Sequence, residues 1–563
     1  MLLFAAGALS RGYAQTTYGS IVGNARDATG AVVAGLQVAV TNEATGVKAT
    51  QLTNEVGAYS FTTLFPGKYS IHAASSGFRP VDVNGIQLEV NQTVRFDLSM
   101  EIGQVNERVE VAATLATLAT DTSDVGQVVE NREVVDLPLN GRQYLQLATL
   151  TNGVYLTGGQ GGESAGPQFK SEGVRFNSDS FLIGGVETRI TRNSTYGLSL
   201  SVDAIGEFKI LQNSFSAEYG RGASIVLATV KKGTNEFHGS AFEFLRNDTL
   251  DARYSYNFTN HKQPLRQNQF GASFGGPVRR NRLFFFTNYE GTRIRIANVA
   301  NVLEPSEAQF GGDLSTMKAV ATDPSNGMPF PGNLIPQNRI SQFAKAGSQY
   351  FTRPTGASLT GFNLTAFTGQ QTRDDQGTAR VDYVMNEKNR LDGFVTLADY
   401  YVYSPAPNPF SGSLSTRQAK PTLGAEYTHI FSPTLLNNLH FGYFHNVLYS
   451  GQEKTAGSNV AGTDFGLKNV NPNTWAYAAP GMGISGFQYA GASEWQPTGA
   501  TDINTQINDQ VSITRGRQIM KFGTDLRWVQ ADDLGWAVQN GTLNFNGQYT
   551  GNSMADFLLG LPS

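Results

Sequence analysis

The second half of the chain, from Phe237 onward, constrains the fold most, because apolar and polar residues alternate there in long segments. Alternation with a period of two predicts β-strands, and roughly ten residues tilted by about 40° span about 25 Å, the apolar height of an outer-membrane barrel. Ten segments fit this description: His238–Arg246, Gln267–Gly275, Arg282–Arg293, Gly377–Val384, Asn389–Tyr400, Pro421–Ile430, Leu435–Asn446, Thr505–Thr514, Ile519–Val529 and Thr542–Tyr549.

The connections between these segments have two very different lengths. Ala297–Gln376 and Val447–Asn504 are long, and a soluble β-sandwich would rarely carry two loops of that length. Short turns at one end and long loops at the other are typical of bacterial outer-membrane barrels. The tight connections are Gly276–Asn281, Met385–Lys388, Phe431–Thr434 and Arg515–Gln518.

Residues 236–563 are therefore predicted to form the wall of a transmembrane antiparallel β-barrel. Ten strands cannot close around a domain of more than a hundred residues, because outer-membrane barrels with a filled lumen use about 22. We expect the barrel to be partial and the sequence to be a fragment that continues past its C-terminal end.

The composition narrows the functional classes. Charged residues make up 16% of the chain and the net charge is −4, with no basic stripe, so no nucleic-acid partner is predicted. The 62 glycines, 35 phenylalanines and 22 tyrosines suit a turn-rich barrel with aromatic girdles. The absence of cysteine excludes disulfides and thiolate metal sites.

The N-terminus, residues 1–15, is a short apolar run that ends in the small-x-small sequence Gly12-Tyr13-Ala14. We expect a signal peptide whose true start lies upstream, with a buried helix as the alternative. No later stretch reaches the ~18 apolar residues of a membrane helix.

Residues 16–100 are predicted to be a small antiparallel β-sandwich. The spacing of GSIVGNARDATGAVVAGLQVAVTN and of the step Pro66-Gly67-x-Tyr69 is similar to that of the carboxypeptidase regulatory-like domain. The resemblance implies a transthyretin-like, carbohydrate-binding-like fold and no activity, and sugar binding is a minority hypothesis. The predicted strands are Ser20–Ala25, Leu36–Thr41, Ala58–Thr62, Tyr69–Ala73 and Val94–Leu98.

Residues 121–235 are predicted to be an α+β domain organised around Ser201–Asn235. Two strands, Glu207–Gln212 and Ala223–Lys231, flank a glycine-rich turn and end on a lysine pair. This stretch resembles the closing segment of the plug domain of TonB-dependent outer-membrane transporters. The positions that carry the plug signature are Tyr219, Gly220, Gly222, Lys232 and Gly233.

Two further stretches resemble the Oar-like subgroup of these transporters. Asp136–Arg142 (DLPLNGR) is similar to its plug start, and Phe270–Arg293 to its first wall hairpin. That hairpin would place Phe284, Phe286 and Tyr289 at the lipid face or aromatic girdle; a buried core strand is the alternative.

The resemblance also assigns two plug loops. Thr157–Gln168 and Thr188–Leu198 would be the apical loops that meet an extracellular ligand. Between them Gly184-Gly185 stands where the family commonly has Asp-Gly, so any contact made by that aspartate is absent.

The polar linker, residues 101–120, contains alternating charge and valine. The resemblance makes this segment a candidate TonB box, the peptide that adds a strand to a TonB-type periplasmic energiser. The last strand of the sandwich is the alternative, and both interpretations stand open. The candidate residues are Glu107, Arg108, Val109, Glu110, Val111 and Ala112.

No catalytic constellation is present in the sequence. Two G-x-S-x-G matches, Gly162–Gly166 and Gly271–Gly275, lack the strand before and the helix after that this motif needs. Asp374-Asp375 and Asp532-Asp533 could bind Ca²⁺ in loops, and solvated acidic pairs are the expected interpretation. None of the six histidines has H-E-x-x-H or H-x-x-E spacing: His72, His238, His261, His429, His440 and His445. We predict no enzyme, no cofactor and no metal.

The predicted protein is mainly β, with a transthyretin-like β-sandwich, an α+β plug domain and a partial β-barrel in the bacterial outer membrane. The expected function is TonB-dependent uptake of a large or scarce ligand: a saccharide, a peptide or a siderophore. Its partners would be the energiser, the extracellular ligand and outer-membrane lipid. The first alternative is a structural or adhesion protein without active uptake. The second, a soluble secreted carbohydrate-binding protein, requires Phe237–Ser563 to be water-soluble.

Overall fold

The structure, a computed structural model, describes residues 18–563 apart from 104–108, 113–124, 138, 158–167, 172–177, 192–194, 213–215, 220–223, 253–261, 357–360, 407–413, 453–458, 469–477, 493–496, 517 and 534–539. The expected signal peptide lies outside the described residues. Among the described helices, none has the length and apolar character needed to cross a membrane.

The N-terminal domain is a β-sandwich of two sheets with an apolar interior. Ile21, Leu36, Ile71, Val83 and Leu88 are at most 1% exposed between the sheets. One sheet contains β1 (Gly19–Asp27), β4 (Ala58–Leu64), β7 (Thr93–Arg95) and β8 (Leu98–Met100). The other has the order β3-β2-β5-β6-β9, from β2 (Gln37–Asn42), β3 (Lys48–Leu52), β5 (Gly67–Ala74), β6 (Val81–Leu88) and β9 (Val109–Ala112).

Two strands of this domain were not expected from the sequence. β3 is short and mostly polar, so it carries no alternation signal. β6 contains Gly85 with φ 79°, a conformation that favours glycine and interrupts the apolar pattern.

The domain predicted to be a plug, called the plug below, extends from β10 to β18 and is an α+β unit centred on the two strands expected from the sequence. β17 (Ile205–Gln212) and β18 (Ser224–Val230) pair antiparallel, and every residue of β18 is buried because both of its faces are covered. The sheet order is β10-β17-β18-β13-β14, with β10 (Val125–Glu130), β13 (Asp179–Ile183) and β14 (Val186–Glu187); α1 (Asn131–Asp136) follows β10. Two small hairpins are added by β11 (Val154–Thr157) with β12 (Gln168–Ser171) and by β15 (Arg189–Ile190) with β16 (Thr195–Tyr196).

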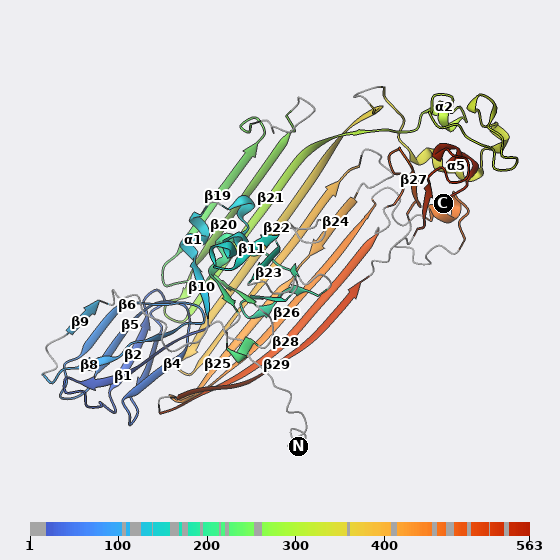
Figure 1. Ribbon diagram of the computed structural model, residues 1–563. Coiled ribbons are helices and arrows are strands. Elements are labelled where there is room, and N and C mark those ends of the chain that lie inside the picture. Colours follow the sequence, from blue (N-terminus) through green and yellow to red (C-terminus); the bar gives the residue numbers. More distant parts are fainter. Residues whose placement is uncertain are drawn as a thin grey trace, which may run out of the picture.

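The remaining long strands form one antiparallel sheet, the wall, which curves around the plug (Figure 1). Its neighbours along the sheet follow chain order, as in an up-and-down barrel. In the described residues, β19 and β29 pair on one side only, so the wall is an open sheet. The strands are β19 (His238–Asn247), β20 (Leu265–Arg279), β21 (Leu283–Val302), β22 (Leu364–Asn386), β23 (Asn389–Ser404), β24 (Leu414–Ala419), β25 (Thr422–Ser432), β26 (Leu435–Gln452), β28 (Thr498–Arg515) and β29 (Gln518–Asp533).

The burial pattern of the wall is inverted relative to a soluble sandwich. Along β28 the polar side chains Asn504, Gln506 and Asn508 are buried toward the plug, whereas Ile503 and Ile507 on the other face are half-exposed. Polar residues inside and apolar residues outside are the pattern of a strand that faces lipid. The second alternative, a soluble secreted carbohydrate-binding protein, requires a water-soluble second half and does not agree with this pattern.

The wall strands end within the four predicted tight turns, although β20 continues to Arg279, well into the first of them. These strand ends lie at the end of the wall that carries the N-terminal domain (Figure 1). The strands themselves are longer than the expected ten residues: β21 has 20 and β22 has 23. Both continue past the height of an apolar band toward the long-loop end. β24 was not expected, because Lys420-Pro421 interrupts the pattern between β24 and β25, and proline has no N–H for the ladder.

Two aromatic residues expected at the lipid face point inward instead. Phe284 and Phe286 are at most 2% exposed, while Tyr289 is 44% exposed. Side chains alternate between the two faces of β21, so Phe284 and Phe286 share the inner face and Tyr289 lies on the outer face. At the start of this strand the inner face is covered by Lys231 and by the N-terminal domain. That cover explains why two large aromatic side chains are tolerated inside the wall.

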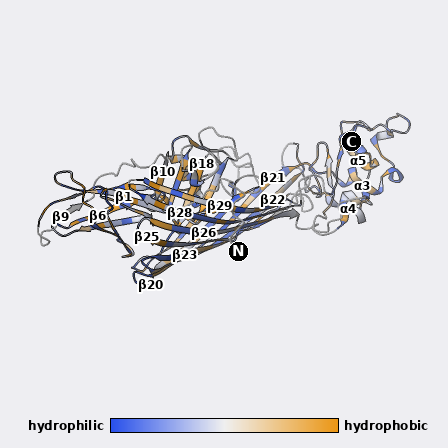
Figure 2. Ribbon diagram, turned by 90° about the horizontal axis from the view of Figure 1, so that it is seen from below, coloured by the Kyte–Doolittle hydropathy of each residue, from blue (hydrophilic) through white to orange (hydrophobic). Residues whose placement is uncertain are grey.

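The two long connections and the segment after β29 assemble a small domain, the cap, from the described residues 303–356, 459–468, 478–492 and 540–563. It lies beyond the ends of β21 and β22, opposite the N-terminal domain (Figure 2). Its core is aromatic, and the ring of Phe557 contacts those of Phe310, Phe351 and Phe545. It contains α2 (Glu307–Phe310), α3 (Gln342–Gly347), α4 (Val460–Thr463), α5 (Ser553–Leu559), β27 (Gly481–Ile484) and β30 (Thr542–Phe545).

The prediction that Thr542–Tyr549 is a wall strand is therefore wrong. Only β30 is a strand there, and it pairs parallel with β27 inside the cap. The chain then turns into α5, where the Asn552 side chain accepts hydrogen bonds from the backbone N–H groups of Met554 and Ala555. Gly560, with φ 73°, ends this helix.

One acidic residue makes the cap sensitive to pH. Glu304 is fully buried where β21 enters the cap, and neither carboxylate oxygen has a hydrogen-bond partner among the described residues. Burial raises the pKa of Glu304 from 4.5 to about 8, against the opposing charge of Arg353. Because the folded-state pKa is the higher one, the stability that this group contributes is fully present below pH 4.5 and is lost as the pH rises through 8.

We expect the cap to become more sensitive to limited proteolysis as the pH rises from 4.5 to 8. Glu304→Gln, which stays neutral, should remove most of this change. Proteolysis at a series of pH values, with a protease of flat activity over that range, measures it. An unchanged pH dependence in the variant would contradict the assignment to Glu304.

Candidate functional site

The plug signature lies where the plug meets the wall and the N-terminal domain. Tyr219 is 1% exposed and packs with Leu211, Ile225 and Leu227 of the plug sheet. Gly220 and Gly222 lie outside the described residues. The Tyr219 side chain thus belongs to the apolar packing of the plug sheet.

Lys232 and Gly233 connect the plug to the first wall strand. A Cβ on Gly233 would meet the carbonyl oxygens of Phe285 at 2.4 Å and Gly276 at 2.7 Å, so this position requires glycine. The Lys232 ammonium lies over the Phe65 ring of the N-terminal domain, 2.8 Å from its centroid. Burial, together with the positive charge of Arg380, lowers the pKa of Lys232 well below its usual range.

Arg142, the last residue of the DLPLNGR motif, anchors one side of the plug. Its guanidinium pairs with Asp203 of the plug and lies 3.6 Å from Glu290 of wall strand β21. The same group stacks on Phe242 and Phe244 of β19, at 4.1 and 5.2 Å from the ring centroids. One arginine thus connects the plug to two wall strands.

Acidic plug residues contact the last wall strand on the opposite side. Arg527 of β29 donates to Glu187 at 3.2 Å, and Gln506 accepts from the Glu187 backbone N–H at 3.0 Å. Lys521 donates to both carboxylate oxygens of Glu218, at 3.1 and 3.4 Å. Ion pairs therefore connect the plug to β29 at one edge of the open wall and to β21, the third strand from the other edge.

A cavity of about 280 Å³ separates the plug from the inner wall. Plug residues Arg142 and Tyr196 line one side, and wall residues of both charge signs line the other. This arrangement can hydrogen-bond a polar ligand. The wall residues, which sequence motifs did not indicate, include Glu290, Asp374, Gln376, Tyr400 and Lys420. The alternation of β21 to β23, which turns every second residue inward, could have found Glu290, Asp374, Gln376 and Tyr400, whereas Lys420 lies between β24 and β25.

The two acidic pairs do not form cation sites. Asp374 lines the cavity, whereas Asp375 points to the other face of β22 and accepts from Tyr289 at 2.6 Å and Arg293 at 2.7 Å. Consecutive residues of a strand lie on opposite faces, so the two carboxylates cannot converge. Asp532 and Asp533 are exposed on β29, and no group of three metal-ligating side chains occurs in the part of the chain that is described.

The predicted apical loops are described only in part. Thr157 and Gln168 pair at the ends of β11 and β12, and the residues between them lie outside the described part. In the second loop, the Thr191 backbone N–H donates to Asp502 of the wall at 2.9 Å. This loop therefore contacts the inner wall at β28.

The turn Gly184-Gly185 packs on the wall where the family commonly has Asp-Gly. Both glycines have positive φ, 53° and 84°. His440 of β26 contacts the Gly184 carbonyl oxygen at 3.1 Å, and Gln506 donates to that of Gly185 at 2.6 Å. His440 is thus a wall residue that supports the plug.

The candidate TonB box is a strand in this structure. Val109–Ala112 form β9, which pairs parallel with β6 from Val81↔Val109 to Asn84↔Ala112. Glu107 and Arg108 lie outside the described residues. Of the two interpretations left open, the structure contains the sandwich strand; a TonB box formed by the same residues would be presented on the N-terminal domain.

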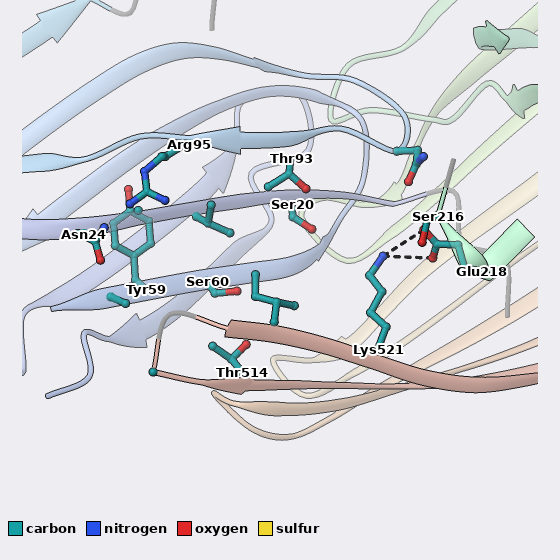
Figure 3. A pocket seen from close by; sticks show the side chains of 16 residues that line it. Ser20, Asn24, Tyr59, Ser60, Thr93, Arg95, Ser216, Glu218, Thr514 and Lys521 are labelled. Carbon is teal, nitrogen blue, oxygen red and sulfur yellow. Dashed lines mark hydrogen bonds and ion pairs between the residues drawn. The ribbon is translucent and has the colours of Figure 1, made fainter. Parts of the chain in front are cut away.

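The N-terminal domain contacts both the plug and the tight-turn end of the wall. Gln51 donates to the Pro433 carbonyl oxygen at 2.8 Å and Asn54 to that of Gly516 at 3.0 Å. A cavity of about 570 Å³ remains between the sandwich, the plug and the β28–β29 turn; Tyr59, Glu218 and Lys521 are among its lining residues (Figure 3).

Residues 229–563 match the family model of the outer membrane beta barrel domain. The chain belongs to this family. The outer membrane beta barrel assignment covers more than half of the chain and confirms the expected mainly β fold and outer-membrane location. Residues 20–101 match the carboxypeptidase regulatory-like domain, which confirms the resemblance of the N-terminal segment to that module.

This outer membrane beta barrel protein is also similar to individual proteins. It is 24% identical over 288 residues to the TonB-dependent transporter Oar of Myxococcus xanthus, covering 45% of this chain and 26% of that protein. The chain thus spans about a quarter of the length of this relative.

Solved structures of outer-membrane proteins are similar at low identity. The outer membrane transporter YddB from Escherichia coli matches with TM-score 0.46 and 8% identity, over 72% of this chain and 48% of that one. The ferric enterobactin receptor PfeA from Pseudomonas aeruginosa matches with TM-score 0.40 and 12% identity, over 73% and 50%.

Proposed function

We propose that this outer membrane beta barrel protein is a TonB-dependent active transporter of the Oar-like type. The observation that carries the proposal is a separate plug domain inside the curved wall, connected to it by Lys232-Gly233 and held by Arg142 and Glu187. A barrel that only scaffolds or adheres needs no such domain across its lumen. The similarity to Oar supports the same reading and a role without covalent chemistry.

In this mechanism a ligand too large or scarce for porins binds from the long-loop side. The apical loops 157–168 and 188–198 and the plug–wall cavity would contact it. The energiser would pair with the Glu107–Ala112 segment at the tight-turn end and draw the plug aside, using the inner-membrane proton gradient. The ligand is a saccharide, a peptide or a siderophore, and the mixed charges of the cavity suit a polar molecule.

We also propose that the chain is divided into the domains expected from the sequence, and that these domains together carry out the transport. The segments are a signal peptide (1–15), the sandwich (16–100), a linker with the energiser segment (101–120), the plug (121–235) and the first part of the barrel (236–563). The chain's partners would be the energiser, the extracellular ligand and outer-membrane lipid.

Uptake by cells that express the full-length gene product tests the proposal. Three fluorescent probes represent the ligand classes: ferric enterobactin, maltoheptaose and a casein peptide digest. We expect accumulation of at least one probe, and its loss with a proton uncoupler or on deletion of 107–112. Accumulation that resists both treatments, or no accumulation of any probe by a heat-modifiable outer-membrane protein, would favour the structural or adhesion role.

A further inference from the structure

The cavity between the plug and the inner wall contains a balanced set of charges. Two of its lining residues are cationic, Arg142 and Lys420, and two are anionic, Glu290 and Asp374. Arg142 and Glu290 lie 3.6 Å apart, and Glu290 also accepts from Ser201 at 2.6 Å, so this pair is occupied within the protein. The charges that remain for a ligand are those of Lys420 and Asp374.

Neither of these two charges is compensated by a contact within the described residues. Lys420 is 8% exposed and lines the cavity, and its ammonium makes no hydrogen bond or ion pair in the part of the chain that the structure describes. The Asp374 carboxylate also lacks such a partner among those residues. A charge taken out of water is costly unless it is paired, so each group is stabilised most by a ligand group of opposite charge.

The wall holds the two groups at a defined separation. Asp374 lies on the inner face of β22, opposite Tyr400 in the β22–β23 ladder. Lys420, between β24 and β25, donates its backbone N–H to the Ala398 carbonyl oxygen of β23 at 2.9 Å. Pro421 follows, and a residue before proline is restricted to extended conformations. Because β23 lies between them, the two positions are about 10 Å apart across the sheet.

We propose that this cavity binds a short peptide by its two termini, with the Lys420 ammonium at the C-terminal carboxylate and the Asp374 carboxylate at the N-terminal ammonium. The proposal rests on the proposed function and names its substrate class. A peptide of three residues extends about 10 Å, which matches the separation of the two groups. Leu198, Leu200 and Ile294 line the same cavity and would contact an apolar side chain of the peptide.

The other two ligand classes satisfy this set of charges less well. A neutral saccharide offers hydroxyl groups, but it leaves both buried charges without a counter-charge. A siderophore with net negative charge would be attracted by Lys420 and repelled by Asp374. The four charges that line the cavity sum to zero, so a molecule with one charge of each sign is the best match.

Calorimetric titration of the full-length protein in detergent with the tripeptide Ala-Leu-Ala tests the proposal. Three further probes separate the contributions: the N-acetylated tripeptide, the C-amidated tripeptide and maltotriose. We expect each blocked tripeptide to bind about tenfold more weakly than the free one, the change that loss of one charge-assisted hydrogen bond produces, and maltotriose to bind more weakly still. Equal affinities for the free and blocked tripeptides, tighter binding of maltotriose, or no binding of the free tripeptide would overturn the proposal.

Two substitutions assign each terminus to its partner. Lys420→Met should weaken binding of the free tripeptide about tenfold and remove the effect of C-terminal amidation, while the effect of N-acetylation persists. Asp374→Asn should remove the effect of N-acetylation and keep that of amidation. Glu387→Gln and Lys388→Met are the matched controls, because both residues are exposed in a tight turn of the wall, and they should bind the tripeptide as the unmodified protein does.

The gel shift on boiling shows whether each variant is folded before it is titrated, and the blocked tripeptides test the site on the unmodified protein even if a variant does not fold. An effect of amidation that persists in the Lys420 variant, or an effect of acetylation that persists in the Asp374 variant, would overturn the proposal. Failure of the proposed function is seen separately. Probe uptake that is absent or resists the uncoupler, in a protein that still binds the tripeptide, would refute transport and leave the binding site in place.

Discussion

Replacing Arg380 with methionine is expected to destabilise the folded protein by about 3–5 kcal/mol, because it leaves buried carboxylates without their counter-charge. Arg380 lies on the inner face of β22 with its side chain 6% exposed, and it contacts Asp382 at 2.8 Å and Asp392 at 2.9 Å. Tyr18 of the N-terminal domain donates to the same Asp392 at 3.2 Å. The change should thus loosen the N-terminal domain as well as the wall.

Urea unfolding of the full-length protein in lipid vesicles, followed by tryptophan fluorescence and by the gel shift on boiling, measures this effect. Arg417→Met is the matched control, because Arg417 pairs with Asp399 at 3.0 Å on the same wall while its side chain is 69% exposed. Exposed pairs contribute about 0–1 kcal/mol, so the control should unfold almost as the unmodified protein does. Equal shifts for the two variants would refute the buried network.

Replacing Phe557 with alanine is expected to unfold the cap while the wall stays intact. Phe557 is fully buried, with its ring centroid 5.2 Å from that of Phe545 and 5.8 Å from that of Phe351. Removing a buried phenylalanine destabilises by about 3–5 kcal/mol, which is large for a domain of this size. Limited proteolysis should then cut within the cap, and the heat-dependent gel shift of the wall should persist.

Phe362→Ala provides the comparison, since Phe362 lies in the connection between β21 and β22, which supplies one segment of the cap, and is 41% exposed. Its proteolysis pattern should match that of the unmodified protein. If the Phe557 variant were as resistant as the Phe362 variant, the aromatic core would not be what holds the cap together.

The wall could be predicted from the sequence because each strand carries its own signal. In β28, polar and apolar residues alternate over the whole strand, and the tight turns break the alternation at defined places. The same signal misassigned Thr542–Tyr549, where Leu543 and Phe545 alternate just as a wall strand would but face the cap. Alternation identifies a strand and not the sheet to which it belongs.

The site could be predicted only where one short segment carries it. Gly233 is such a case. Neighbouring backbone comes so close to this position that only glycine fits, and a glycine at one position is visible in the sequence. The partners of Arg142 were not predictable: Glu290 and Phe242 are single residues on separate strands, and only the sheet register brings them to the plug. The inward orientation of Phe284 and Phe286 likewise depends on the N-terminal domain, far away in the chain.

The composition of the cap from three distant segments has a consequence for the order of folding. Contacts such as Phe310 with Phe557 close a loop that contains most of the wall, and such non-local contacts form slowly. The strands from β21 to β29 must pair before the three segments can meet. Pairing of these strands has then already overcome the entropic cost of closing the loop. Assembly of the aromatic core is therefore a late event in folding. It takes place only after the wall strands have paired with their correct neighbours.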